Sequence, residues 1–468
     1  MNRRIFIQRS LILTGSLALT FKNTFGFRKN AAVTGKVTAA GKPVAGALIS
    51  DGFSIVKTST NGSYQIATDT KAEFVFVIVP AGYEIPHEKQ IASHYHRISE
   101  GGSFDFKLKP LKKNDSKHSF IVWADPQVKN KKDVAQMLAQ SVPDTVKTIK
   151  ALGPDTLVHG IAVGDLVWDN HDLFPMYNEA VAEMGIPFYQ GLGNHDMDYR
   201  QGGDETSDQT FKKFYGPTYY SFNRGRAHYV MLDDVRYLGT EREYDGYITE
   251  QQLNWLEKDL AYVAKDDLLF ICLHIPVYSS VKNNEDLYKL LKPFKNVHIL
   301  SGHTHYNANN IKGNVFEHNH GTVCGAWWTG PVCEDGTPRG YAVYSVEGNQ
   351  VKWYYKPMEM DRTNQMSVFV EELTGQKRMI ANVWNWDPAW KVEYWLDGQY
   401  KGELKNEHGM DPLTVKLYKG PELPNPRPFV EPRDTDHLFV AHFEPGVKQV
   451  KVVATDRFGE KFQHEVKA

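Results

Sequence analysis

Five short apolar segments, each followed at once by a polar cluster, constrain the folding of this chain of 468 residues more than any other feature. Strand-like and helical stretches alternate around them between residues 118 and 358, and such alternation predicts an α/β core. The segments begin at Phe120, His159, Ile186, Phe270 and Val297. Because α/β sheets bind ligands beyond the carboxyl ends of their strands, we expect the five clusters to meet at one edge if the segments are neighbouring strands.

The five polar clusters carry side chains that bind divalent metal ions. Asp, Asn and His supply oxygen and imidazole ligands, and one carboxylate can bridge two ions. Two ions about 4 Å apart can clamp a phosphoryl group and bind a water that ionises near neutral pH. The glycines at 164, 193 and 302 allow tight turns where the segments end. The clusters, which together predict a two-metal hydrolytic site, are Asp125-Pro126-Gln127, Gly164-Asp165, Gly193-Asn194-His195-Asp196, His274 and Gly302-His303-Thr304-His305.

In composition and order, these clusters resemble the signature of the calcineurin-like metallophosphoesterases. The resemblance covers the middle half of the chain and implies a four-layer αββα core. It also implies a metal-dependent phosphoric ester hydrolase, either a phosphatase or a phosphodiesterase, that uses two divalent ions (manganese, iron, zinc or magnesium). In the reaction so implied, a hydroxide held between the ions attacks phosphorus in line.

The resemblance further implies a role for each matching residue. Asp165 would bridge both ions. His195 would stand near the phosphoryl oxygen or the leaving group as an acid or charge stabiliser, and Asp196 would orient His195. Asp169, close to the second cluster, is a further candidate for a supporting role. The other ligands would be Asp125, Gln127 and His305 for the first ion and Asn194, His274 and His303 for the second.

Position 127 departs from the family pattern, whose first motif is usually Asp-x-His. Gln127 offers a neutral carbonyl oxygen in place of an imidazole nitrogen. If it ligates, the first site favours manganese, magnesium or iron over zinc. If it does not ligate, one ion is loosely held. The second possibility motivates an alternative function, a glycan- or partner-binding envelope protein with a weak or vestigial metallophosphoesterase centre.

The segments on either side of the core are β-like. Residues 28–112 contain an Asn61-Gly62 hairpin signal and a strongly apolar strand at 74–79, and they resemble a β-sandwich of the transthyretin or carboxypeptidase-regulatory type. Residues 113–358 form the predicted catalytic domain. Residues 359–468, with a hairpin signal at Asp397-Gly398, predict a second β-sandwich. Both flanking modules resemble the N- and C-terminal domains of an exported bacterial subgroup of the family.

The first 27 residues have the pattern of an export signal. Arg3 and Arg4 precede an apolar run at 10–21 that is too short for a comfortable membrane span. The stretch at 3–7 resembles the twin-arginine export pattern, and an ordinary secretory signal fits equally well. We therefore expect an exported protein, periplasmic or extracellular, without a membrane anchor.

Charge and the remaining residues limit the partners of the chain. Lysine and arginine number 54 against 56 acidic residues, so there is no basic excess for a stable nucleic-acid complex. The expected partner is a phosphate-ester substrate: a phosphorylated glycan, lipid, nucleotide or phosphoprotein.

Trp327 and Trp328 either stack on a sugar or base or pack against the C-terminal sandwich. Cys324 and Cys333 either pair or stay free.

Overall fold

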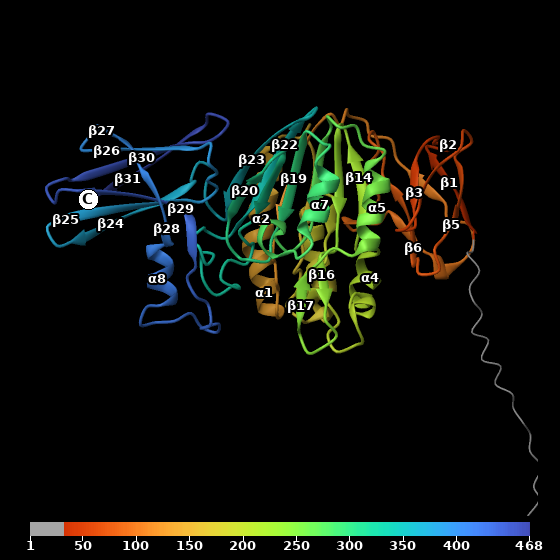
Figure 1. The fold of residues 1–468 in the computed structure, drawn as a ribbon, viewed down its shortest axis with the longest axis horizontal. Helices are drawn as coiled ribbons and strands as arrows, with labels where there is room; N and C mark the ends of the chain where they lie inside the picture. Colours follow the sequence, from red (N-terminus) through yellow and green to blue (C-terminus); the bar gives the residue numbers. More distant parts are fainter. Residues whose placement is uncertain (1–31) are drawn as a thin grey trace, which may run out of the picture.

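The computed structural model describes residues 32–468 as three bodies in a row (Figure 1). A small β-module is coloured red to orange, a central α/β body orange through green to teal, and a second β-module blue. The predicted export signal, residues 1–27, lies outside the described residues. Among residues 32–468, no helix is both long enough and apolar enough to cross a bilayer.

The central body contains two sheets, and the five predicted segments divide between them. Strands β11, β12 and β13 are parallel neighbours in the first sheet, and β18 and β19 are parallel neighbours in the second. The first has the order β23 (Gln350–Pro357), β22 (Gly340–Glu347), β11 (Lys117–Trp123), β12 (Leu157–Ala162), β13 (Phe188–Gln190), β8 (Ile91–Ala92), β7 (His87–Glu88). The second has the order β14 (Tyr220–Arg224), β15 (Ala227–Met231), β18 (Leu268–Cys272), β19 (Asn296–Ser301), β21 (Val315–Asn319), β20 (Ala308–Lys312).

The two sheets pack face to face through aromatic side chains. Phe120 of β11 lies 5.0 Å from Phe270 of β18, ring centre to ring centre, and Tyr189 of β13 stacks on Phe222 of β14 at 3.9 Å. Every residue of β18 is buried, as expected for a strand covered on both faces. Helices cover the outer faces, so the predicted four-layer αββα core is confirmed. They are α2 (Val142–Ala151) and α3 (Phe174–Ala182) on the first sheet and α5 (Glu250–Leu260) and α7 (Asn284–Leu291) on the second.

The N-terminal module consists of two small sheets. One joins β1 (Ala32–Ala39) to β10 (Phe106–Leu108), β2 (Lys42–Pro43) and β5 (Ser63–Ala67), and the other has the order β4 (Ile55–Lys57), β3 (Leu48–Ser50), β6 (Phe74–Ile78), β9 (Tyr95–Arg97). The predicted hairpin at Asn61-Gly62 is wrong, because β5 pairs with β1 instead of the preceding strand. Asn61 still forms a turn, in which its Oδ1 accepts from the Ser63 N–H at 2.9 Å.

The C-terminal module is a sandwich of two four-stranded sheets. The predicted Asp397-Gly398 hairpin is confirmed, because Leu396 of β26 pairs with Gln399 of β27. One sheet has the order β24 (Met366–Leu373), β25 (Gln376–Val383), β29 (Asp434–Phe443), β28 (Lys405–Met410), and the other β27 (Gln399–Glu403), β26 (Lys391–Leu396), β30 (Gln449–Thr455), β31 (Lys461–Lys467).

Both junctions with the core are closely packed. Strands β7 and β8, within the segment predicted as a separate N-terminal sandwich, extend the first core sheet. After α8 (Pro412–Tyr418), the connection to β29 runs against the core, where Arg427 bonds the Asp133 carboxylate at 2.6 Å. The domain boundaries at 112/113 and 358/359 stay a prediction.

The remaining elements lie close to the central body. They are α1 (Lys131–Gln136), α4 (Gln209–Tyr215), α6 (Val277–Ser280), β16 (Val235–Tyr237) and β17 (Tyr244–Gly246).

Candidate metal centre

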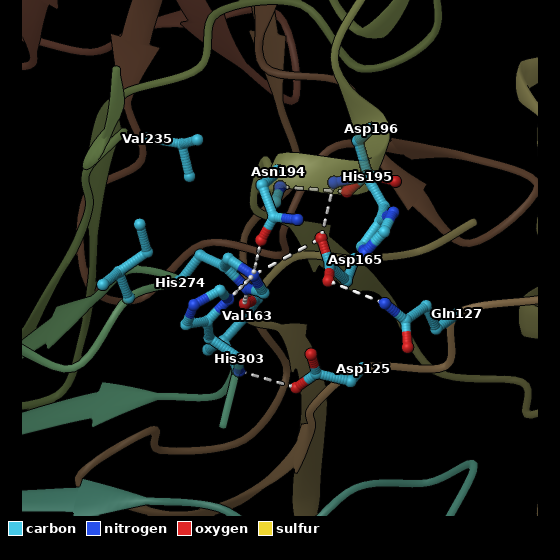
Figure 2. Close-up of polar contacts among 12 residues, drawn as sticks. Asp125, Gln127, Val163, Asp165, Asn194, His195, Asp196, Val235, His274 and His303 are labelled. Atoms are coloured by element: carbon cyan, nitrogen blue, oxygen red, sulfur yellow. Dashed lines mark hydrogen bonds and ion pairs between the residues drawn. The ribbon is translucent and has the colours of Figure 1, made fainter. Parts of the chain in front are cut away.

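The seven candidate ligands converge where the carboxyl ends of the two sheets meet; Figure 2 shows six of them, and the seventh, His305, lies beside Asp125. The first sheet contributes residues that follow β11, β12 and β13, and the second contributes residues that follow β18 and β19. They are Asp125, Gln127, Asp165, Asn194, His274, His303 and His305. Parallel strands end at the same edge, and the packing of two sheets brings two such edges together.

Three of these side chains form a compact donor group. Asp165, His274 and His303 each place one ligand atom within 4.8 Å of the others. The Nε2 of His274 lies 3.1 Å from the Asn194 Oδ1, 3.2 Å from the His303 Nδ1 and 3.4 Å from the Asp165 Oδ1. Such separations match the edges of a coordination shell with bonds of about 2.1 Å. The Nδ1 of His274 donates to the Val163 carbonyl at 2.8 Å, so its Nε2 is turned toward the group.

A second group surrounds Asp125. The Nε2 of His305 lies 3.4 Å from the Asp125 Oδ1. Within residues 32–468, three buried atoms of this group have no hydrogen-bond partner: Asp125 Oδ1, Gln127 Oε1 and His305 Nδ1. Buried polar atoms without partners are unfavourable, and a divalent cation between Asp125 and His305 would satisfy the Asp125 Oδ1. The donor set therefore fits metal ions of the kind the sequence predicts.

Gln127 presents its amide nitrogen to the centre. Its Nε2 donates to the Asp165 Oδ2 at 3.1 Å, whereas its Oε1 is the atom without a partner among the described residues. The side chain is buried and lines the site. Its oxygen, the atom needed for ligation, points away from Asp165 (Figure 2).

The backbone of the site is unusually strained. Five of the seven candidate ligands have φ in the left-handed region, with values of 48° for Asp125, 42° for Gln127, 52° for Asp165, 71° for His303 and 57° for His305. Such conformations in residues other than glycine cost about 1–3 kcal/mol each and concentrate at functional sites. The residue pattern predicted the ligands but not this strain.

The site glycines serve two different purposes. Gly164 has a φ of 93° and makes the expected tight turn. Gly193 and Gly302 are needed for close approach: an added Cβ would lie 2.2 Å from the Asp165 Oδ1 at position 193 and 2.5 Å from the Asp125 Oδ2 at position 302. The two candidate carboxylate ligands therefore pack directly on glycine backbone.

Asp196 does not orient His195, so the predicted role is wrong. Its buried carboxylate accepts from the backbone N–H groups of Leu166 and Val167, both at 3.1 Å, and of Gly193 at 2.9 Å. The carboxylate beside His195 is Asp169, whose Oδ1 lies 2.8 Å from the Nδ1 of His195. Arg242 bonds the other oxygen of Asp169. Asp196 instead ties the loop after β12 to the loop after β13.

The electrostatics of the protein groups follow from burial and pairing. Burial lowers the pKa of His274, but the neighbouring Asp165 charge outweighs it and raises the pKa to about 10. Burial and the His274 charge lower the pKa of His303 to about 4. The charges of His274 and His195 lower the pKa of Asp165 below its usual value in spite of burial. Without a metal ion, the Asp165 carboxylate is therefore paired with a protonated His274. A metal ion that binds to His274 would have to displace that proton.

Sequence reasoning missed one buried carboxylate, Asp234. Its Oδ1 accepts from the backbone N–H of His274 at 3.0 Å and of Ile275 at 3.1 Å, so it fixes the turn that carries His274. A signal was present, because Asp234 follows the apolar strand β15 as the other polar residues follow theirs.

Other histidine and cysteine residues, which could ligate a metal by their chemical type, lie outside the donor groups. His320 contacts the Ser301 carbonyl and the Tyr344 hydroxyl and is structural. Cys272, Cys324 and Cys333 are all buried and free. Trp327 does lie at the site, where a cavity of about 400 Å³ is lined by the donor groups together with Tyr244, Trp327 and Arg433.

Three family models match consecutive parts of the chain. Residues 31–111 match the N terminal of Calcineurin-like phosphoesterase, residues 118–307 match Calcineurin-like phosphoesterase, and residues 317–462 match the C terminal of Calcineurin-like phosphoesterase. No curated protein is significantly similar to the chain.

Several solved structures are distantly similar. A purple acid phosphatase from yellow lupin seeds is 13% identical with a TM-score of 0.38, and the match covers 63% of this chain and 54% of the lupin chain. GAP50, the anchor in the inner membrane complex of Plasmodium, is 14% identical with a TM-score of 0.33 over 51% of this chain and 84% of its own. The chain thus spans about half of the lupin protein, and such scores carry no argument about activity.

Proposed function

This chain belongs to the calcineurin-like phosphoesterase family, as its motifs predicted, and from that premise we propose that it is an exported hydrolase of phosphate mono- or diesters that uses two divalent metal ions. The observation that carries the proposal is the convergence of seven donor side chains from two sheets, three of which (Asp165, His274 and His303) place ligand atoms within 4.8 Å of one another. When bound, the ions would supply Lewis-acid stabilisation of the phosphoryl oxygens and a hydroxide nucleophile at neutral pH.

Asp165 is our candidate for the bridging ligand. Its Oδ1 lies 3.4 Å from the Nε2 of His274 in one donor group, and its Oδ2 lies 3.1 Å from the Nε2 of Gln127 in the other. We assign Asn194, His274 and His303 to one ion and Asp125 and His305 to the other. Gln127 joins the second set if its amide rotates to present Oε1.

His195 is our candidate for the residue that acts on the leaving group. Asp169 accepts at the Nδ1 of His195, which holds the ring with a proton at that nitrogen and leaves Nε2 for the substrate. The main chain of His195 also donates to the Asp165 Oδ1 at 2.9 Å, so the ring is held close to the bridging carboxylate. A protonated Nε2 would donate to the departing oxygen or to a phosphoryl oxygen.

Two variants test this function and distinguish metal binding from catalysis. Asp165→Asn should lose both bound metal and turnover, whereas His195→Ala should retain metal and lower turnover by about 10²–10⁴-fold. Metal content by mass spectrometry is measured beside hydrolysis of a nitrophenyl monoester and its bis ester, which also decides between phosphatase and phosphodiesterase. Unchanged turnover of Asp165→Asn would overturn the assignment.

A second candidate function rests on Gln127. Because its amide nitrogen faces Asp165, one ion site is weaker than in members with histidine there, and the protein could serve mainly to bind a glycan or an envelope partner. Metal-dependent turnover well above background contradicts this candidate. Export itself rests on residues 1–27, and retention of the full chain in the cytoplasmic fraction would contradict it.

A further inference from the structure

An aromatic wall stands beside the candidate metal centre. Trp327 stacks on His305, with ring centres 4.2 Å apart and planes at 25°. Phe429 lies 5.2 Å from Trp327 and 5.7 Å from Trp168, and Trp168 lies 5.7 Å from His195. We call Trp168, Trp327 and Phe429 the aromatic wall. It runs from a candidate metal ligand to the candidate acid.

The aromatic wall is partly exposed, although Trp327 also packs against a small apolar cluster of Ala326, Val332, Tyr418 and Val430. Phe429 is 52% exposed, and Trp168 and Trp327 are half-buried. Trp327 lines the same cavity of about 400 Å³ as Asp165 and His195. An exposed aromatic patch that opens onto a reactive site is typical of a ligand-binding surface.

Contacts on several sides hold the wall in place. The buried Arg427 bonds Asp133 and lies 5.3 Å from the Trp168 ring centre. On the other side of Phe429, the Arg433 N–H donates to the Glu334 carbonyl at 2.9 Å. The segment that carries Phe429 is therefore anchored to the core at both ends, although it belongs to the C-terminal module.

The loop of Trp327 is similarly constrained. Trp327 and the next residue, Trp328, have φ of 46° and 63°, a region that residues other than glycine rarely adopt. The Nε1 of Trp328 donates to the Pro126 carbonyl at 2.8 Å, which ties this loop to the first metal-binding segment. A rigid surface loses less conformational entropy when it binds a ligand than a mobile surface does.

The three rings are not equivalent. Lys129 places its Nζ 4.0 Å from the Trp168 ring centre, and Arg427 also lies over that ring. Two cationic side chains of the protein therefore already contact the ring of Trp168. Phe429 has the greatest exposure of the three, and Trp327 lines the cavity. A ligand in the cavity would therefore meet Trp327, and a part of the ligand that extends out of the cavity past Trp327 would reach Phe429, whose ring centre lies 5.2 Å away.

We propose that the aromatic wall binds the organic group of the phosphoester and that this group carries a ring that stacks on aromatic side chains, either a nucleobase or a sugar. This inference rests on the proposed function: with phosphorus at the donor groups and the ester oxygen near His195, the rest of the substrate extends along the rings that connect His195 to His305. Nucleobases and sugars share an apolar ring face that stacks on aromatic side chains. A phosphoester without a ring would leave Phe429 uncovered.

Two ligand pairs test the inference by binding, independently of turnover. Adenosine 5′-monophosphate and ribose 5-phosphate differ only in the base, and glucose 6-phosphate and glycerol 3-phosphate differ in the sugar ring. Stacking of one base changes affinity about tenfold or more. All four ligands are used as phosphonate analogues, in which a methylene group replaces the ester oxygen and prevents hydrolysis. We expect metal-loaded wild-type protein to bind the ring-bearing member of at least one pair about tenfold more tightly in calorimetry, and the pair that responds identifies the class of ring.

The variants are Phe429→Ala and Phe429→Leu, with Leu373→Ala as control. Phe429→Ala should remove the preference and Phe429→Leu, which keeps apolar bulk without a ring, should weaken it. Leu373 is 40% exposed at the end of β24 and its variant should behave as wild type. Equal affinities within both pairs in wild type, or an unchanged preference in Phe429→Ala, would overturn the inference. Absence of turnover with an intact ring preference would instead count against the proposed function alone.

Discussion

The contact between Gly193 and Asp165 supports a quantitative prediction for Gly193→Ala. A Cβ built at position 193 would lie 2.1 Å from the Asp165 backbone nitrogen and 2.2 Å from its Oδ1. Non-bonded heavy atoms normally stay more than about 3 Å apart. The methyl group therefore forces the loop after β13 and the candidate bridging carboxylate apart by about 1 Å.

A displacement of this size has a predictable effect on turnover. Misplacing a reacting group by about 1 Å lowers the rate by about 100-fold, which corresponds to about 2.7 kcal/mol of transition-state stabilisation. The same displacement spoils the geometry of both ion sites, so we expect the metal content of Gly193→Ala to fall as well.

The assay compares kcat/KM and bound metal per chain in wild type, Gly193→Ala and the control Gly446→Ala. An added Cβ at Gly446 has no heavy atom within 4 Å, so that variant should match wild type. If Gly193→Ala kept full metal content and turnover within threefold of wild type, the close approach of Gly193 and Asp165 would have no functional role and the reasoning would fail.

Three further predictions concern side chains around the centre and in the interior. Asp169→Asn should lower turnover without loss of metal, because Asp169 contacts His195 and no candidate ligand; metal loss would contradict this. His94 has a pKa of about 3 because it is buried, so unfolding should become easier by about 1.4 kcal/mol per pH unit as the pH falls below 6.5. Because other buried histidines such as His298 and His320 also have lowered pKa values, His94→Phe should reduce the slope between pH 5 and 7 in urea titrations by the contribution of one proton, and an unchanged slope would argue against a buried neutral ring. Lys356→Met should lower the free energy of unfolding by about 3–5 kcal/mol, because the buried Asp144 loses the ammonium that it contacts at 2.8 Å; an unchanged urea midpoint would refute this.

The failures of sequence-based prediction share a physical cause, which is dependence on long-range pairing. The Asn61-Gly62 signal describes a local turn, and the turn forms, but β5 pairs with β1 because the register with a distant strand buries its apolar residues. Asp196 lies next to His195 in sequence, yet its carboxylate turns toward the backbone N–H groups of Leu166 and Val167 in the loop after β12 and of Gly193 in its own loop. Asp169, 26 residues away, reaches the ring instead.

The chain by itself determined the chemistry of its site. The identity of each donor and its position directly after an apolar segment are local properties, and so is the hairpin at Asp397-Gly398, so they can be read without knowledge of the fold. Tertiary structure alone decided that the donors come from two sheets instead of one, that Asp234 holds His274, and that Phe429 of the C-terminal module completes an aromatic wall. These features depend on which distant surfaces pack together, and that choice is made by the burial of whole faces and not by any short stretch of residues.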